Sequence, residues 1–253
     1  MSTFHSHIAV SIVIPARNEE DFLPACLSAI DAQETDAQLE IIVVDNGSTD
    51  KTVLIAEGHG VQVLYEPVPG VGRARAHGTR AAHGTYVLHI DADTRLPKTY
   101  IQEALTRFAA DPSLVCLGGR MRWYDAGKMY NAVCWSFHMV FAPLVRFLTR
   151  GALGPIGNNM MFLKSIYDKT TGFDTNVNFG EDADIAKKLH TYGKVRLDLS
   201  LVCDTSSRRF RTFKDITRHI VNTTYLCLNK AIPYNYLSPS MWRKAKETSS
   251  IDK

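Results

Sequence analysis

Hydrophobic residues in the first half of the chain form short runs that alternate with segments of helical periodicity. The apolar runs predict β-strands at residues 10–14, 40–45, 61–66 and 85–90. Apolar residues at helical spacing predict helices after these strands, at residues 19–30, 49–58, 72–84 and 98–111. Repeated units of strand, helix and strand are typical of a mostly parallel sheet with helices on both faces. We therefore expect an α/β fold.

The regular alternation ends in the second half of the chain. Apolar runs predict further strands at residues 114–123 and 195–202. Helical periodicity is present from Glu181 onward and again at residues 212–228, whereas residues 229–253 are polar. The sequence has no internal repeat and no low-complexity linker, so we expect one α/β domain with a polar tail.

One long apolar segment, residues 132–148, needs separate consideration. Ser136, His138, Pro143 and Arg146 interrupt it, and a membrane span needs roughly 20 mostly apolar residues. We do not expect a transmembrane helix. Two interpretations stay open: a buried pair of helices, or a surface helix that contacts a membrane or a lipid-linked substrate.

Composition excludes several classes of protein. With 253 residues, 45% of them hydrophobic, the chain can bury a sizeable core. The net charge of +3 is too small to indicate a nucleic-acid partner, and we expect none. No Lys or Arg precedes the first apolar run, which favours a strand over a signal peptide and predicts a cytoplasmic protein. The cysteines show neither paired nor CxxC spacing, so we expect reduced core residues at Cys26, Cys116, Cys134, Cys203 and Cys227.

Polar residues follow each of the first four predicted strands. Ligands of open α/β sheets bind outside the carboxyl ends of the strands, so these residues are expected to line one crevice. The charged residues among them are Arg17, Glu19, Asp45, Asp50, Arg73, Arg75, Asp91 and Asp93. Carboxylates bind a hard metal ion, the metal bridges phosphate oxygens and arginines complete the neutralisation. The mixture therefore suits a nucleoside diphosphate held through a divalent cation.

The segment DNGSTD, which begins at Asp45, allows two roles. Asn46, Ser48 and Asp50 are expected to cap the following helix, because short polar side chains accept hydrogen bonds from the first N–H groups of helices. Asp45 itself stands at a strand end, and we expect it to bind a base or ribose.

Glu181 and Asp182 begin a predicted helix directly after Gly180. Acidic residues in a first turn are stabilised by the helix dipole, which is a sufficient structural reason for them. A carboxylate facing a cleft at this position would also be able to take a proton from an attacking hydroxyl group. Both interpretations stay open on the sequence pattern alone.

Six segments, in order, resemble the family 2 glycosyltransferases of GT-A fold. They are SIVIPARNEE, IIVVDNGSTDKT, ARAHG, HIDADT, GNNMMF and GFDTNVNFGEDADIAKKL. The resemblance covers roughly residues 10–210. It implies a GT-A domain at residues 1–228, with a nucleotide-binding half at about 8–123 and an acceptor half at about 124–228, followed by a tail at 229–253.

The resemblance also implies the roles of single residues. Asp91 and Asp93 would form the DxD motif that holds Mn²⁺ or Mg²⁺, with Asp93 as the direct ligand and Asp91 nearer the ribose. The residues expected around the nucleotide are Pro15, Ala16, Arg17, Glu19, Asp45, Arg75, Asp91, Ala92 and Asp93. Asp182 would be the catalytic base of an inverting, metal-dependent transfer of a sugar, from a nucleotide-sugar donor such as a UDP-sugar, to a hydroxyl acceptor.

The second half of the chain is expected to contact the acceptor, a saccharide or a lipid-linked hydroxyl compound. The sequence SSRRF stands where processive synthases of the family carry QxxRW, which argues against a processive enzyme but lets Arg208 and Arg209 approach the diphosphate. Arg146 and Arg150 are placed to meet anionic headgroups, so we expect a peripheral contact with the inner face of a membrane. Candidate acceptor contacts are Trp123, Tyr124, Tyr130, Trp135, Phe137, Phe141, Phe147, Asn158 and Asn159.

Two rival interpretations come from other classes of protein. A strand followed by DxDxT also opens the haloacid dehalogenase-like phosphatases, in which Asp91 would be the nucleophile. In those enzymes the motif follows the first strand, whereas here it follows the fourth. The other rival is a GT-A module that binds a nucleotide sugar without catalysis.

Overall fold

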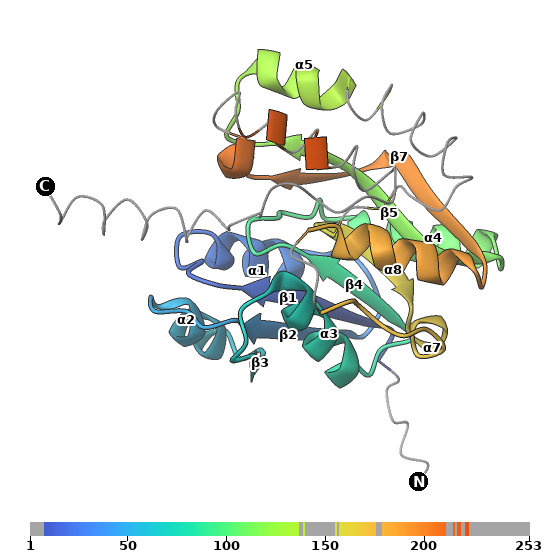
Figure 1. Ribbon diagram of the computed structural model, residues 1–253, viewed down its shortest axis with the longest axis horizontal. Coiled ribbons are helices and arrows are strands. Elements are labelled where there is room, and N and C mark those ends of the chain that lie inside the picture. The colour runs from blue at the N-terminus through green and yellow to red at the C-terminus, as the bar shows by residue number, and fades with distance from the viewer. Residues whose placement is uncertain are drawn as a thin grey trace, which may run out of the picture.

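A computed structural model of the chain describes residues 8–136, 157–175 and 179–210, together with residues 139, 155, 215, 217, 218, 221 and 222. Within this part a seven-stranded sheet has the order β3-β2-β1-β4-β6-β5-β7, and helices cover both of its faces (Figure 1). The predicted α/β fold is confirmed.

Among the described strands, one runs against the others. The strands are β1 Val10–Ala16, β2 Leu39–Asp45, β3 Gln62–Tyr65, β4 Tyr86–Ile90, β5 Leu114–Trp123, β6 Asn159–Leu163 and β7 Lys194–Thr205. Strand β6 is antiparallel to both β4 and β5, and the remaining pairs are parallel. The segment GNNMMF was not predicted as a strand. Since β6 is reversed, its first residues lie at the edge where its neighbours end.

The helices divide between the two faces of the sheet. They are α1 Leu23–Asp31, α2 Thr52–Gly58, α3 Val71–Ala81, α4 Tyr100–Ala110, α5 Lys128–Ser136, α7 Lys164–Tyr167 and α8 Glu181–His190. Apolar residues of α1, α2 and α4 pack on one face, and those of α3, α7 and α8 pack on the other. Side chains of β1 point alternately to the two faces of the sheet. Ile12 and Ile14 pack in the core with α1, α2 and α4, and Val13 packs in the core with α3, α7 and α8.

Helix α1 begins at Leu23, later than the predicted start at residue 19. The backbone before Leu23 is bonded to the segment at the start of α2. The N–H of Glu19 donates to Thr52 Oγ1 at 2.7 Å, and that of Glu20 donates to Asp50 Oδ2 at 3.1 Å. Pro24 lies in the first turn, where a missing N–H costs no helical hydrogen bond. This arrangement keeps Glu19 in a loop at the carboxyl end of β1.

Helix α3 lies very close to the sheet. A Cβ atom placed on Gly78 would stand 2.4 Å from Val13 Cγ1 and 2.9 Å from Val44 Cγ2. Only glycine fits between the helix and strands β1 and β2. The same helix carries Arg75, so this close packing also fixes the depth of that residue.

The cysteine prediction is confirmed where the structure tests it. Cys26, Cys116 and Cys203 are free and buried, and burial raises the pKa of the Cys203 thiol to about 12. The Cys134 side chain and Cys227 lie outside the described residues.

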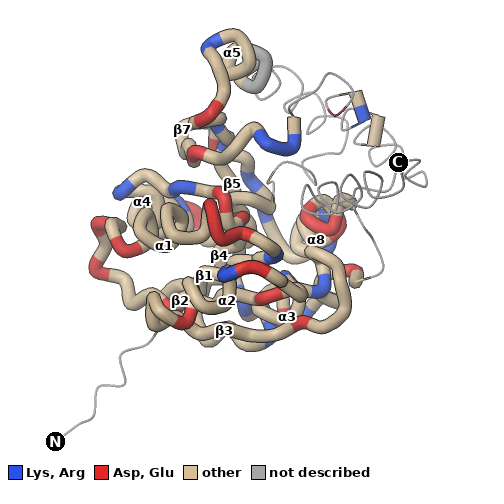
Figure 2. Tube along the Cα trace, turned by 90° about the vertical axis from the view of Figure 1, so that its left-hand side faces the viewer, with Lys and Arg blue, Asp and Glu red and all other residues tan. Residues whose placement is uncertain are grey.

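Other predictions also fall on parts of the chain that the structure leaves out. These are most of the helix at 212–228, residues 140–148 of the apolar segment, and the tail at 229–253. Among the described helices, none has the length and hydrophobicity that crossing a membrane requires. Figure 2 shows both positive and negative residues along the described trace, and between Arg17 and Lys51 the charged residues are all acidic.

His89 is a fully buried titratable residue of β4. The Thr79 hydroxyl donates to the Arg75 carbonyl at 2.7 Å, so it accepts from His89 Nε2 at 2.9 Å. The other ring nitrogen, Nδ1, has no hydrogen-bond partner among the described residues. The rings of Phe162 and Phe173 lie against the imidazole, at centroid distances of 5.6 and 5.2 Å. Burial, and secondly the charge of Arg75, lower the pKa of His89 well below its usual value.

We predict that His89 makes the fold less stable in acid. Because the folded-state pKa is lowered, the unfolded chain takes up the proton first, and stability is lost as the pH falls below about 6.5. The loss approaches about 1.4 kcal/mol per pH unit for a single group. Urea unfolding at pH 7.5 and 5.5 should show this loss in the wild type and a smaller one in His89→Gln. His83→Gln, at an exposed position, is the control. An equal loss in His89→Gln and the wild type would contradict the assignment.

Candidate active site

A cleft of about 140 Å³ lies at the carboxyl edge of the sheet. Strands β4, β5 and β7 end there and the reversed β6 begins there, so segments far apart in the sequence meet. Polar and aromatic residues that line the cleft include Arg75, Asp91, Asp93, Trp123, Asn158, Glu181, Asp182, Thr205 and Arg209. Four of the residues predicted for the site, Arg75, Asp91, Asp93 and Asp182, are therefore brought together.

Asp91 and Asp93 both line the cleft from a turn that follows β4, and the N–H of Thr94 closes this turn by donating to the Asp91 carbonyl at 2.9 Å. Ala92 between them points into the hydrophobic core and is 2% exposed. Asp91 Oδ1 accepts from Arg75 Nη2 at 2.8 Å, and its other oxygen lies 3.6 Å from Arg209 Nη2. Burial acts to raise the pKa of Asp91, but the charges of Arg209, Arg75 and Arg208 outweigh burial and lower it. Asp91 is thus held as a carboxylate.

Asp93 differs from Asp91 in its electrostatic balance. Its Oδ1 accepts from the Thr205 hydroxyl at 3.2 Å and its Oδ2 from Arg208 Nε at 2.7 Å. Burial raises the pKa of Asp93, and the negative charge of Asp91 adds to the rise. Because burial disfavours the charged form of Asp93, nearby cationic groups are needed to keep this side chain ionised.

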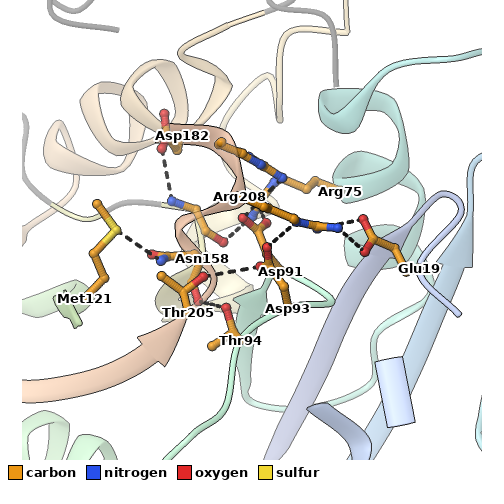
Figure 3. A network of polar contacts seen from close by, with 12 residues as sticks. Glu19, Arg75, Asp91, Asp93, Thr94, Met121, Asn158, Asp182, Thr205 and Arg208 are labelled. Carbon is orange, nitrogen blue, oxygen red and sulfur yellow. Dashed lines mark hydrogen bonds and ion pairs between the residues drawn. The ribbon is translucent and has the colours of Figure 1, made fainter. Parts of the chain in front are cut away.

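Arg75 connects three parts of the site from helix α3. It is 3% exposed and donates to Asp91 and to the carbonyl of Gly157, while its Nε lies 3.5 Å from Glu181 Oε1. A Cβ on Gly157 would stand 2.6 Å from Arg75 Nη2, so glycine is needed for this approach. The N–H of Gly157 donates in turn to Asp182 Oδ2 at 3.0 Å. One short segment thus links the DxD pair to the predicted base (Figure 3).

Glu181 and Asp182 begin α8 after Gly180, whose φ of +84° lies in the left-handed region. Glu181 is buried, and desolvation followed by the charge of Asp182 raises the pKa of Glu181 to about 7. Asp182 accepts hydrogen bonds from two backbone N–H groups, those of Gly157 and Ala183, and lies on the cleft wall. Both acids line the cleft, but Glu181 is buried and Asp182 is partly exposed, so Asp182 is the more accessible to a ligand.

Glu19 reaches the site through Arg208. Arg208 Nη1 and Nη2 donate to the two carboxylate oxygens of Glu19 at 2.6 and 2.8 Å. The Arg208 guanidinium also lies 4.4 Å from the centroid of the Phe22 ring. Burial raises the pKa of Glu19. Arg208 belongs to a short 3₁₀ helix, η2 Ser207–Phe210, that directly follows β7.

The other nucleotide candidates lie beside the cleft and do not line it. Pro15 and Ala16 end β1, and Ala16 pairs in register with Asp45 at the end of β2. Asp45 accepts from the N–H of Ser48 at 3.0 Å, which closes a turn. Arg17 follows β1, and its Nε is buried without a partner among the described residues.

The capping interpretation is wrong for Asn46 and for Ser48, whose Oγ accepts from the N–H of Asn18 at 3.0 Å. Of the three residues, only Asp50 bonds to the start of α2, although Lys51 is the N-cap residue. Asp50 accepts from the N–H of Thr52, the first residue of α2, at 2.9 Å. Asn46 instead bridges two loops, because its amide donates to the carbonyls of Glu66 and Val68 and its oxygen accepts from Gly70. The segment after β3 is thereby tied to the end of β2, which the sequence pattern did not reveal.

The two asparagines at the start of β6 have different roles. Asn158 lines the cleft, as expected for an acceptor contact. Asn159 is 1% exposed and bonds within the sheet, accepting from the N–H of Gly119 and donating to Cys203 Sγ. Its predicted contact with a sugar is therefore wrong. Sequence patterns did not identify Gly157 and Thr205 as site residues, although the glycine before the asparagine pair was a usable signal for close backbone approach.

The carboxylates of the site fit a divalent cation that is coordinated partly by the protein and partly by the phosphates of a bound nucleotide. In the described part of the chain, no group of three or more His, Cys, Asp or Glu side chains is arranged to hold a metal. The available donors are hard carboxylate oxygens of Asp91 and Asp93. Mg²⁺ characteristically takes one or two carboxylates and completes its shell with waters and substrate phosphates. The donor set therefore matches a cation bound jointly with a diphosphate.

A mostly parallel sheet with one reversed strand, and a DxD pair at its carboxyl edge, defines the class of GT-A nucleotide-diphospho-sugar transferase folds. A family model described as glycosyl transferase family 2 matches residues 11–171, more than half of the chain. The chain belongs to glycosyl transferase family 2.

Curated relatives include a PGL/p-HBAD biosynthesis glycosyltransferase of Mycobacterium bovis, which is 30% identical over 71% of this chain and 73% of its own length. An uncharacterized glycosyltransferase of Mycobacterium tuberculosis is 48% identical over 85 residues, 34% of this chain. The matched region spans only 37% of that relative.

Solved structures share the fold. A mannosyltransferase from Pyrobaculum calidifontis, in complex with GDP-Man and Mn²⁺, has a TM-score of 0.70 at 21% identity, covering 91% of this chain and 66% of its own. Glucosyl-3-phosphoglycerate synthase from Mycobacterium tuberculosis, in complex with Mn²⁺, UDP and glucosyl-3-phosphoglycerate, has a TM-score of 0.61 at 20% identity, covering 88% and 81%.

We predict that Arg75→Met strongly destabilises the fold. Removing Arg75 leaves the buried Asp91 carboxylate without its main hydrogen-bonded cation, which costs about 3 to 5 kcal/mol. Arg80→Met, at an exposed position of the same helix, is the matched control and should change stability by less than about 0.5 kcal/mol. Denaturant unfolding at neutral pH measures both. Equal effects of the two substitutions would show that the network contributes nothing.

Proposed function

We propose that this protein is an inverting hexosyltransferase that moves a sugar from a nucleotide-diphospho-sugar, a UDP-sugar by preference, to a hydroxyl acceptor. One observation carries the proposal: Asp91, Asp93 and Asp182 open onto the same cleft at the carboxyl edge of the sheet. A cation-binding pair and a general base in one cleft are what a single displacement at a sugar carbon requires. Family membership and the nucleotide complexes of proteins with the same fold support it.

Each acid has a separate task in this mechanism. Asp182 takes the proton of the acceptor hydroxyl while the acceptor oxygen bonds to the sugar carbon and the carbon–diphosphate bond breaks on the opposite side, which inverts the configuration. The N–H of Gly157 orients Asp182. A Mn²⁺ or Mg²⁺ ion held by Asp91 and Asp93 would neutralise the charge of the leaving diphosphate. Arg75 orients Asp91 for that task.

The residues argue against both rival interpretations. Family membership contradicts a haloacid dehalogenase-like phosphatase, and in this structure Asp91 lies against Arg75 and Arg209. A module that only binds nucleotide sugar needs no base. Here Asp182 is held by backbone N–H groups on the cleft wall.

The acceptor side of the protein supports a lipid-linked substrate and a peripheral contact with the cytoplasmic face of a membrane. Helix α5 exposes large apolar side chains, with Met129 76% and Trp135 52% exposed. A groove beside them is lined by Arg120, Arg122 and Lys128. Amphipathic surfaces of this composition bind anionic bilayers. Further residues expected here, Phe137, Phe141, Arg146, Phe147 and Arg150, lie outside the described residues.

The catalytic assignment predicts that Asp182→Asn keeps donor affinity but loses turnover. A general base contributes about 10² to 10⁴-fold to the rate. Release of UDP from a panel of UDP-sugars should fall by that factor, while UDP affinity by calorimetry should change by less than about threefold. EDTA should abolish wild-type turnover and Mn²⁺ should restore it. Asp184→Asn, two residues further along α8, is the control. An Asp182→Asn rate within a few-fold of wild type would reject this base.

The acceptor assignment predicts binding to anionic liposomes. Wild type should co-sediment with vesicles of mixed neutral and anionic lipids at low salt, because each basic residue near the surface contributes about 1 kcal/mol. Trp135→Glu should lose at least about threefold of the bound fraction. Leu54→Glu, at a similarly exposed apolar position on α2, should not. The proposal fails if wild type stays in the supernatant, or if both substitutions have the same effect.

A further inference from the structure

Arg208 occupies the space between two acids of the nucleotide half. Its Nε donates to Asp93, while Nη1 and Nη2 donate to Glu19 in a bidentate pair (Figure 3). The side chains are largely enclosed, at 10% exposure for Arg208, 13% for Glu19 and 3% for Asp93. Ion pairs with this degree of burial are screened little by solvent. Arg208 is therefore the counter-ion on which both carboxylates depend.

The contacts of Asp93 leave little room for a second cation. One carboxylate oxygen accepts from Thr205 and the other from Arg208. A divalent ion that used the second oxygen would have to share it with the Arg208 N–H or displace that N–H, and the positive charge of Arg208 would repel the ion. Contact of Arg208 with Asp93 and coordination of a metal by that oxygen therefore compete.

The chain segment that carries Arg208 is suited to such an exchange. Asp125 fixes the preceding backbone, because Ser206 Oγ and the N–H of Ser207 donate to its two oxygens. The long arginine side chain extends from that fixed point, so it can change partners without movement of β7. A planar guanidinium pairs with phosphate oxygens in the same bidentate manner as with a carboxylate. A diphosphate at the DxD pair would offer Arg208 equivalent acceptors.

We propose that Arg208 is an exchangeable internal counter-ion that makes metal binding dependent on nucleotide. It suppresses binding of a divalent cation to Asp93 alone and transfers its hydrogen bonds to the diphosphate when metal and nucleotide enter together. The inference rests on the proposed function, because it takes the DxD pair as the metal site. Linkage then requires that nucleotide raise metal affinity and that metal raise nucleotide affinity by the same factor.

The test is a titration of Mn²⁺ followed by electron paramagnetic resonance, on the full chain without nucleotide. Arg208→Gln should bind Mn²⁺ at least about tenfold more tightly than wild type, because the competing charge is gone. Arg208→Lys keeps that charge and should stay near wild type. Arg196→Gln, at the other end of β7, is the matched control. Equal or weaker Mn²⁺ binding by Arg208→Gln, with its circular dichroism spectrum intact, would overturn the proposal.

Two further arms locate the ion and separate this inference from the proposed function. Adding Asp93→Asn to Arg208→Gln should return Mn²⁺ affinity to the wild-type value or below, and tight binding by the double variant would also overturn the proposal. With UDP present, wild type should gain Mn²⁺ affinity and Arg208→Gln should gain less. If UDP binds to none of the variants, the proposed function fails, while the nucleotide-free titration still decides whether Arg208 competes with the cation.

Discussion

The buried guanidinium of Arg75 holds together the segments that form the cleft at the carboxyl edge of the sheet. A charge removed from water needs several partners at once, and here they are supplied by Asp91 after β4, the carbonyl before β6 and Glu181 at the start of α8. None of these three segments is adjacent in sequence to helix α3. Their common dependence on one cation fixes their relative positions, and a cleft with defined walls is the result.

The reversed strand β6 brings the Gly157 carbonyl to Arg75. In an all-parallel sheet every strand would begin at the opposite edge, and no strand would bring a segment into the site at its start. Because β6 runs the other way, Gly157 and Asn158 enter the sheet beside the DxD pair. The backbone of Gly157 then faces both directions, with its carbonyl toward Arg75 and its N–H toward Asp182. The Asp91 side and the Asp182 side of the cleft share one peptide segment.

Local sequence patterns were sufficient for the strands that end at the site and for its acids. Apolar runs predicted the last residues of β2, β4 and β5 correctly, whereas β1 ends two residues later and β7 three residues later than predicted. The pattern failed where a contact depends on distant segments. Arg75 meets Gly157 across 82 residues and Arg208 meets Glu19 across 189, and periodicity contains no information at that range. Asn159 failed for a similar reason, since only the neighbouring strands reveal that its side chain is used inside the sheet.

The glycine that seats α3 on the sheet has a consequence for how such an enzyme can change over time. Gly78 lies one turn beyond Arg75 on the same helix, and even a methyl group there would collide with Val13. A substitution that lifts the helix would also withdraw the guanidinium from its three partners. The distance between helix α3 and the sheet therefore determines how far Arg75 reaches into the cleft. Selection on the cleft would constrain this glycine even though it does not line the cleft, and compensation would have to come from smaller side chains on β1 and β2.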